Sequence, residues 1–186
     1  MWLRTLAALV MLASYPGIAN AACTISTVSA NFGGYSGVAL DPGAVPVTVN
    51  CDSSEAYDVG LSAGMGQGAT VTTRKLTGPG GTVLTYKLFQ DAGRSIVWGN
   101  TSGINAQSGI GTSDAQILNI YPRVATDQFV APGTYTDTIT ARVSNTATVT
   151  TAFTITAIVQ ATCTVASQSL DFGSYLGVEK DGAAVV

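Results

Sequence analysis

The sequence predicts an all-β protein: an immunoglobulin-like β-sandwich, followed by the start of a second similar module. Three observations support this fold class. Apolar and polar residues alternate in many short segments, as they do in half-buried strands, and no segment shows a sustained helical period. Turns rich in Gly and Pro separate these segments at the spacing of a sandwich. Finally, the residues after position 162 repeat those that follow position 22.

The repeat has a constant offset of 140 positions, from Cys23 to Cys163 and from Asp41 to Asp181. Seven further residues recur at the same offset: Thr24, Ser29, Phe32, Gly33, Tyr35, Gly37 and Val38. A match without gaps indicates a repeated module. We therefore expect a signal peptide at 1–21 and a sandwich at 22–162 with its final strand at 150–162. The truncated start of a second domain is expected at 163–186.

The N-terminal segment has the pattern of a secretory signal. Arg4 supplies a positive charge, residues 6–13 form an apolar core, and Ala19-Asn20-Ala21 is a small-x-small cleavage site. The apolar run is too short to span a bilayer. Asn20 stands where a lipoprotein signal ending at Cys23 would have Leu, which disfavours that alternative. The protein is therefore expected to be exported, and its cysteines to meet an oxidising compartment.

The cysteines are expected to differ in state. Cys23 and Cys51 should form a disulfide between the first strand and the next, and closing a loop of this size is worth roughly 3 kcal/mol. Cys163 has no partner in the sequence, and the repeat offset places one at position 191, beyond Val186. We expect Cys163 to be unpaired because the second module is cut short; intermolecular pairing or a reactive thiol is the alternative.

The strands can be placed in order by their alternation. They are expected at 25–33, 45–51, 57–63, 84–88, 96–98, 117–123, 135–143 and 150–162. Turns are expected at 41–43, 78–81 and 129–133, and a long polar loop at 101–114. Tyr135 follows a Pro-Gly turn at the start of a late strand, so it is either a tyrosine-corner residue or a simple core tyrosine.

The strand before Cys163 alternates most strictly. One side of this strand carries Phe153, Ile155, Ala157 and Val159, and the other is mostly Thr and Gln. These four residues are predicted to close the first sandwich.

Composition excludes several function classes. Charged residues make up 10% of the chain, the net charge is −3, and no basic stripe exists to bind nucleic acid. The absence of His excludes serine triads and histidine–metal sites, so we expect neither an enzyme nor a cofactor. Asp52 and Glu55 are interpreted as solvated loop charges rather than a glycosidase pair. Trp98 is expected in the core rather than as a platform for a sugar.

Several motifs together resemble the spore coat protein U domain family. They are Cys-x8-Phe-Gly-x-Tyr from Cys23, Leu84-Thr-Tyr-Lys-Leu-Phe, Val97-Trp98-Gly99 and Gly133-Thr-Tyr-Thr-Asp137. The resemblance covers 23–145 and resumes at 163. That family includes subunits of archaic chaperone–usher pili. The resemblance implies a periplasmic chaperone, an outer-membrane usher and a neighbouring pilin subunit as partners, with strands exchanged by β-strand addition.

The arrangement of the modules suggests a position in the fibre. A donor segment usually precedes the first Cys of such a subunit, yet cleavage after Ala21 would leave Ala22-Cys23 at the front. The alternating segment at 151–161 instead closes the first module. We therefore expect a tip adhesin on a cell-surface fimbrium, which attaches to an abiotic or host surface and promotes biofilm formation.

Other functions remain open. The runner-up is a secreted structural protein of a coat or matrix with the same fold and no pilus assembly, in which 151–161 is an ordinary last strand. A third is a carbohydrate-binding module attached to an enzyme.

Candidate adhesive residues are apolar side chains in polar loops. They are Met65, Ile104, Ile110, Phe129 and Val130. Exposed together at one end, they would form an adhesive apolar patch. Taken one at a time, each is favoured to pack against its own loop instead.

Overall fold

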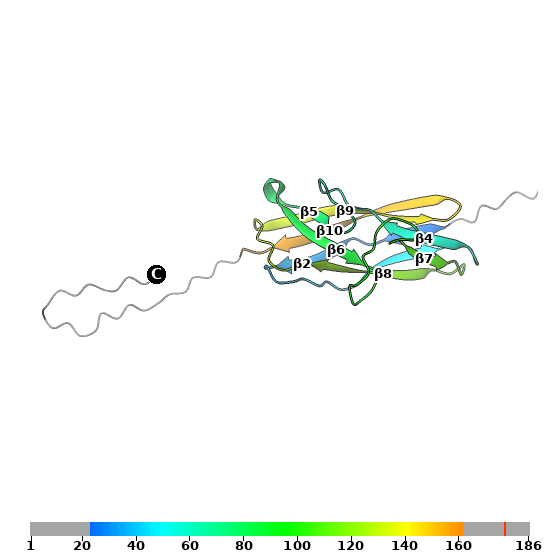
Figure 1. The fold of residues 1–186 in the computed structure, drawn as a ribbon, viewed down its shortest axis with the longest axis horizontal. Coiled ribbons are helices and arrows are strands. Elements are labelled where there is room, and N and C mark those ends of the chain that lie inside the picture. Colours follow the sequence, from blue (N-terminus) through cyan, green and yellow to red (C-terminus); the bar gives the residue numbers. More distant parts are fainter. Residues whose placement is uncertain (1–22, 162–176, 178–186) are drawn as a thin grey trace, which may run out of the picture.

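The structure is a computed structural model that describes residues 23–161 and Gly177, and its strands run along one long axis (Figure 1). The described strands are β1 (Thr24–Thr27), β2 (Ala30–Tyr35), β3 (Val45–Asn50), β4 (Ala56–Leu61), β5 (Arg74–Thr77), β6 (Val83–Phe89), β7 (Gln107–Ile110), β8 (Gln116–Val124), β9 (Gly133–Ser144) and β10 (Thr148–Val159). A short 3-10 helix, η1 (Pro79–Gly81), precedes β6. The predicted signal peptide, Cys163 and, apart from Gly177, the predicted second module lie outside the described residues.

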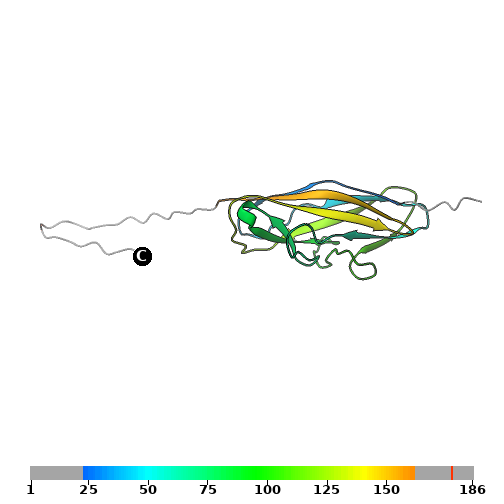
Figure 2. The same cartoon turned by 90° about the horizontal axis from the view of Figure 1, so that it is seen from above.

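The strands form one continuous sheet that curls onto itself. Hydrogen bonds connect β1, β3, β8, β6, β5, β9, β10 and β2 in that order, while β4 joins β9 and β7 joins β4. β1 and β2 stand at the two ends of this path but are consecutive in the chain, so the ends of the sheet are brought together. The result is a two-layered sandwich whose layers are visible when it is turned on its side (Figure 2).

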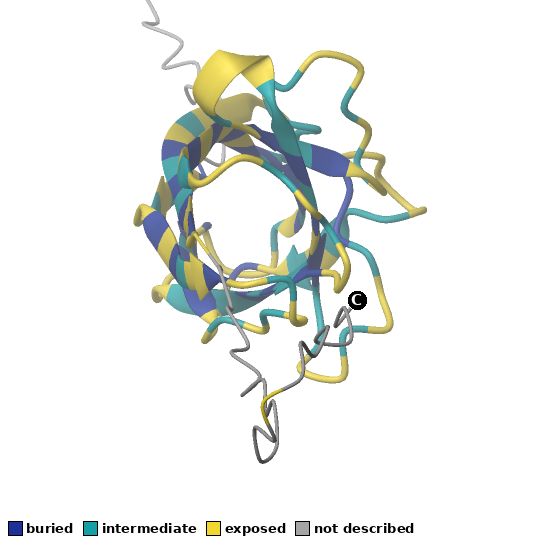
Figure 3. Ribbon diagram, turned by 90° about the vertical axis from the view of Figure 1, so that its left-hand side faces the viewer, coloured by how far each residue is buried: buried dark blue, intermediate teal, exposed yellow. Residues whose placement is uncertain are grey.

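Side chains alternate between the interior and the surface along most strands, as the bands of burial show in an end-on view (Figure 3). The inward-facing residues form one core that draws on strands from both layers, with Val47, Val59, Leu88 and Ile139 fully buried. The prediction of an all-β, immunoglobulin-like sandwich is confirmed.

Two core aromatic residues lock loops onto the sandwich. Trp98 is fully buried and its Nε1 donates a hydrogen bond to the Val59 carbonyl at 2.8 Å, so it is a core residue. Tyr135 is also fully buried, and its hydroxyl donates to the carbonyl of Ala131, 4 residues upstream, at 2.7 Å. This is the geometry of a tyrosine corner.

Three expectations about strands were wrong. The first predicted strand is divided into β1 and β2, and residues 96–98 contribute only an isolated bridge between Val97 and Phe89. The predicted loop at 101–114 contains β7, which pairs with β4 at the edge of the sheet. An edge strand needs no buried face, so its sequence Gln-Ser-Gly-Ile has no apolar alternation to reveal it.

Candidate functional site

The groove between β9 and β2 is filled by β10. All of β10 pairs antiparallel with β9, from Thr148 opposite Ser144 to Val159 opposite Gly133. On its other edge β10 runs parallel to β2, with Val159 opposite Tyr35. The strand predicted to close the sandwich therefore lies between two partners and takes the place of a final strand.

The inward face of β10 fills the core. Phe153, Ile155, Ala157 and Val159 are all buried, with 0–7% of their surface exposed. Burying a large apolar side chain stabilises a fold by about 1.5–3 kcal/mol, so the three larger residues contribute substantially. The described module is thus completed by its own chain.

The disulfide lies at the opposite end of the sandwich from the last residue of β10. Cys23 and Cys51 are bonded across a separation of 28 residues, and both are buried. The bond ties the start of β1 to the end of β3, which are already paired as antiparallel neighbours. The first residue of the described chain is therefore held covalently within the fold.

Removing this disulfide should lower the free energy of unfolding by about 3–4 kcal/mol, because it closes a loop that the unfolded chain would otherwise explore freely. The variant is Cys23→Ala with Cys51→Ala, in a Cys163→Ser background that prevents rearrangement. Urea unfolding with and without reductant measures the effect. Reductant should destabilise the parent and leave the double variant unchanged; a parent equally stable in both conditions would contradict the expectation.

The candidate adhesive residues do not gather at one end of the sandwich, so they do not form the shared apolar patch considered for them. Phe129 precedes Gly133, which lies beside the last residue of β10, whereas Ile110 pairs with Ala56 near the far end of β9. At about 3.4 Å per residue, β9 alone separates these ends by roughly 37 Å. Linear sequence could not reveal this, because the position of each loop depends on strand register.

Most of these residues are nonetheless strongly exposed. The exposed fraction is 79% for Met65, 80% for Ile104, 63% for Ile110 and 90% for Phe129. Val130 is different, because it is partly buried and packs against the core. Each exposed residue is therefore available for contact, but they form no common patch across the whole molecule.

A buried polar network that the sequence did not predict lies inside the sandwich. Arg74 on β5 is fully buried, and its guanidinium donates hydrogen bonds of 2.7–3.1 Å to four carbonyls. These carbonyls belong to Leu61, Ser62, Val71 and Trp98. Burial lowers the pKa of Arg74 to about 10, so it stays charged at neutral pH. These bonds hold the connection between β4 and β5, and the loop that carries Trp98, against the sandwich.

Asp137 on β9 belongs to the same interior. Its carboxylate accepts hydrogen bonds from the Tyr86 hydroxyl at 2.7 Å and from the backbone N–H groups of Met65 and Thr138. Burial, and then the neighbouring Asp137 charge, raise the pKa of Tyr86, which keeps its hydroxyl protonated. Gly64 packs so closely on Asp137 that a Cβ there would overlap the carboxylate. The network is structural, since its groups are bonded to one another and to backbone.

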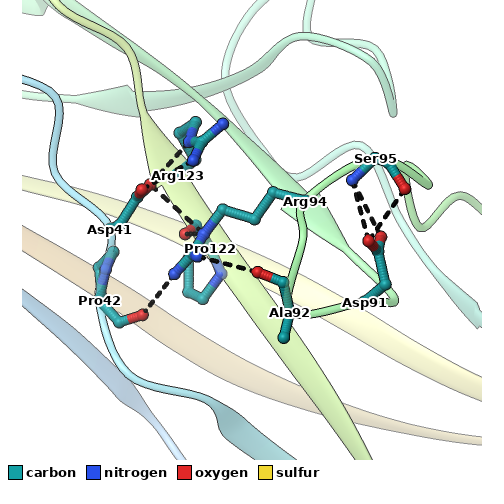
Figure 4. Close-up of polar contacts among 8 residues, drawn as sticks. All are labelled: Asp41, Pro42, Asp91, Ala92, Arg94, Ser95, Pro122 and Arg123. Carbon is teal, nitrogen blue, oxygen red and sulfur yellow. Dashed lines mark hydrogen bonds and ion pairs between the residues drawn. The ribbon is translucent and has the colours of Figure 1, made fainter.

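A second polar cluster lies on the surface, where the loop after β6 meets β8 (Figure 4). Arg123 contacts Asp41 through two hydrogen bonds of 2.7 Å, and Arg94 lies 3.3 Å from the same carboxylate. The hydrogen bond from Arg123 lowers the pKa of Asp41 below its ordinary value of 3.8, and the charges of both arginines act in the same direction. The cluster holds the turn at 41–43 against β8.

Acidification should destabilise the protein through Asp41 and Asp58, whose carboxylate accepts hydrogen bonds from Ser102 and Ser108. These bonds lower the pKa of Asp58 as well. A lowered folded-state pKa gives stability that is present above the unfolded value of 3.8 and is lost as pH falls through the folded value. The melting temperature should therefore fall as the pH drops below the unfolded value of 3.8.

Comparison of variants isolates the contribution of Asp41. Asp41→Asn should be less stable than the parent at neutral pH. On acidification its melting temperature should fall by less than that of the parent. Asp114→Asn is the control, because Asp114 is exposed and has no ion pair among the described residues. Parallel pH profiles for the parent and Asp41→Asn would exclude this role of the carboxylate.

In the part of the chain that the structure describes, no helix is long and apolar enough to cross a membrane. Across residues 23–161 and 177, no three His, Cys, Asp or Glu side chains are grouped as metal ligands.

Comparison with known proteins gives a family and several similar folds. The Spore Coat Protein U domain family matches residues 10–142. Protein U of Myxococcus xanthus is 30% identical over 126 residues, which are 61% of this chain and 70% of that protein. The CooA pilin subunit of enterotoxigenic Escherichia coli has a TM-score of 0.48 and 12% identity, over 75% of this chain and 99% of CooA. AggA, the major subunit of Escherichia coli aggregative adherence fimbriae type I, has a TM-score of 0.46 and 21% identity, over 75% of this chain and 94% of AggA.

Proposed function

Because the chain belongs to the Spore Coat Protein U domain family, we propose that it is a subunit of a surface fibre and occupies the fibre's tip. In this proposal the protein is exported, bound by a periplasmic chaperone and passed through an outer-membrane usher. One observation supports the tip position above all others. The described sandwich is closed by β10 of its own chain, so it needs no strand from a neighbouring subunit.

The disulfide supports the same position. Cys23 is buried and bonded to Cys51, so the first described residue is held within the sandwich. A residue fixed in this way cannot itself be added as an extended strand to another subunit's sheet. In this proposal the repeat that begins at Cys163 connects the chain to the next subunit by β-strand addition.

This orientation selects one end of the sandwich for attachment. The chain leaves the described module at the end of β10, beside Gly133, on the way to Cys163. The opposite end, with the disulfide and Ile110, would face away from the fibre. We propose that this far end makes the contact with abiotic or host surfaces that leads to biofilm formation.

Ile110→Asp should reduce attachment of intact fibres to plastic severalfold, because an exposed apolar side chain at the contact is replaced by a solvated charge. Phe129→Asp is the matched control, since Phe129 is even more exposed but lies at the opposite end. Attachment is counted as bound cells per area at equal fibre density. Equal attachment by the two variants would remove Ile110 from the adhesive surface.

The position in the fibre can be tested directly. Gold-labelled antibody against the described module should mark fibres at their free ends, with one label per fibre. Label distributed along the shafts would exclude the tip position while leaving the chain a fibre subunit. Normal fibres in a strain that lacks the gene's product would likewise show that the subunit does not start assembly.

A coat protein is the second candidate function. The observation that favours it is the 30% identity to Protein U of Myxococcus xanthus together with the spore coat description of the family. The same labelling distinguishes the two, because a coat protein would be found in a continuous layer and in no fibre. Its export would also be independent of a neighbouring chaperone and usher.

A further inference from the structure

A hollow of about 410 Å³ lies on the surface formed by β6, β8 and the loop after β6. Its polar lining consists of Thr73, Thr85, Lys87, Arg94, Ser95 and Arg123. Apolar residues, among them Phe89, Val97 and Ala125, complete it. Hollows of about 300–1,000 Å³ with an apolar lining and a few polar groups are typical of small-ligand sites. None of its lining residues belongs to β10 or to the end that carries the disulfide and Ile110, so the proposed fibre function does not use it.

The charges around this hollow are unbalanced. Lys87 on β6 stands directly opposite Arg123 on β8, and like charges placed opposite each other destabilise a sheet. Arg123 and Arg94 share the Asp41 carboxylate, which leaves Lys87 without a hydrogen bond or ion pair among the described residues. No carboxylate belongs to the described lining. An anion placed here would offset the repulsion between these cations.

The loop that carries Arg94 is held rigidly. The Asp91 carboxylate accepts hydrogen bonds from the backbone N–H group and the hydroxyl of Ser95 (Figure 4). It also accepts one from the backbone N–H group of Ile96. Arg94 has a φ of 56°, a conformation that non-glycine residues adopt only when their surroundings impose it. Its guanidinium donates to the carbonyls of Pro42, Ala92 and Pro122. A site of this kind is organised before a ligand arrives, which lowers the entropy cost of binding.

The hydroxyl groups of the lining indicate which hydrogen-bonding groups a ligand must carry. Thr85 donates its hydroxyl proton to Gln128 at 2.6 Å, and Ser95 donates its proton to Asp91 at 2.9 Å. Each hydroxyl oxygen keeps lone pairs that can accept a hydrogen bond. A ligand that fits therefore carries a negative charge for the cations and hydroxyl donors for these oxygens.

We propose that this hollow binds an acidic saccharide, a sugar ring that carries a carboxylate or a sulfate. The acidic group lies between Lys87 and Arg123, the ring hydroxyls donate to Thr85 and Ser95, and the C–H faces of the ring contact the apolar lining. Carboxylated and sulfated sugars share this chemistry, so the test includes both.

Isothermal titration of the full chain tests the proposal with four probes: oligogalacturonate, a heparin-derived oligosaccharide, inorganic sulfate and neutral dextran. At least one acidic oligosaccharide should bind, and dextran should not. Binding of the first or the second identifies the acidic group as carboxylate or sulfate. Sulfate that binds as tightly as the oligosaccharides would reduce the site to an adventitious ion only, and no binding of either oligosaccharide would overturn the proposal.

Lys87→Gln should weaken oligosaccharide binding by about tenfold or more, as expected for the loss of a charge-assisted hydrogen bond. The variant should fold normally, because Lys87 is exposed and has no partner among the described residues to lose. Arg142→Gln makes the same change of net charge on β9, outside the hollow, and should bind like the parent. Equal weakening by both variants would mean non-specific attraction and would overturn the proposal. This assay measures binding by the purified chain and does not depend on where the chain lies in a fibre. Its outcome is therefore independent of the proposed function.

Discussion

Deletion of residues 148–161 is expected to leave a protein whose first module does not fold on its own. The deletion unpairs the whole outer edge of β9 and one edge of β2. It also removes Phe153, Ile155 and Val159 from the core, at about 1.5–3 kcal/mol each. Their sum is comparable with the total stability of a domain, about 5–15 kcal/mol. Circular dichroism should show no cooperative thermal transition at the temperature where the parent unfolds.

A peptide with the sequence of 148–161, added in trans, should restore that transition. It would re-form both ladders without a covalent link, as strand addition does in complexes. The matched control is the same peptide with Ile155→Asp, which places a charge in the core and should not rescue folding. If the shortened chain melts like the parent without peptide, β10 does not close the module and the tip proposal loses its main support.

Replacement of Arg74 by Met is expected to lower the free energy of unfolding by about 3–5 kcal/mol, as when one partner of a buried charged network is removed. Met is apolar and unbranched, so it fills much of the space but donates no hydrogen bond. Four carbonyls would lose their donor, and the carboxylate of Asp137 would lose a nearby positive charge. Urea unfolding of parent and variant measures the difference.

Lys75→Met is the control for this experiment. Lys75 is the next residue on β5, but its amine makes one exposed hydrogen bond, to the Gln67 carbonyl. Surface changes of this kind alter stability by about 0.5 kcal/mol or less. Equal stability of Arg74→Met and Lys75→Met would show that the buried network adds nothing to the fold.

The sequence predicted those parts of the fold that alternate strongly. The strand β3 carries an uninterrupted apolar face, β9 carries one interrupted only by Asp137, and β10 buries Phe153, Ile155, Ala157 and Val159; their burial follows that pattern. β5 was missed because its inward face consists of Arg74 and Leu76, and an arginine does not mark a buried position. The partners of Arg74 come from three separate places between residues 61 and 98. Such a set is assembled only by the folded chain.

The sequence predicted some parts of the candidate site but not others. Alternation in 150–162 was sufficient to identify a closing strand, because a strand with one apolar face must bury it. Four of the candidate adhesive residues are exposed rather than packed against their own loops, and they are not neighbours, since strand register decides which loops meet. The hollow beside Lys87 left no local signal. Lys87, Arg94 and Arg123 are ordinary surface cations until β6 and β8 pair.

The placement of the two ends of the described chain has a mechanical consequence. Tension along the molecule would enter at Cys23 and leave at Val159, at opposite ends of the long axis (Figure 1). The disulfide would pass the load from Cys23 directly to Cys51, so the segment between them could not be pulled out. The parallel ladder of β2 and β10 would be loaded in shear, and its bonds would have to break together rather than one after another. The module is therefore built to bear traction that would peel apart a sandwich with both termini at one end.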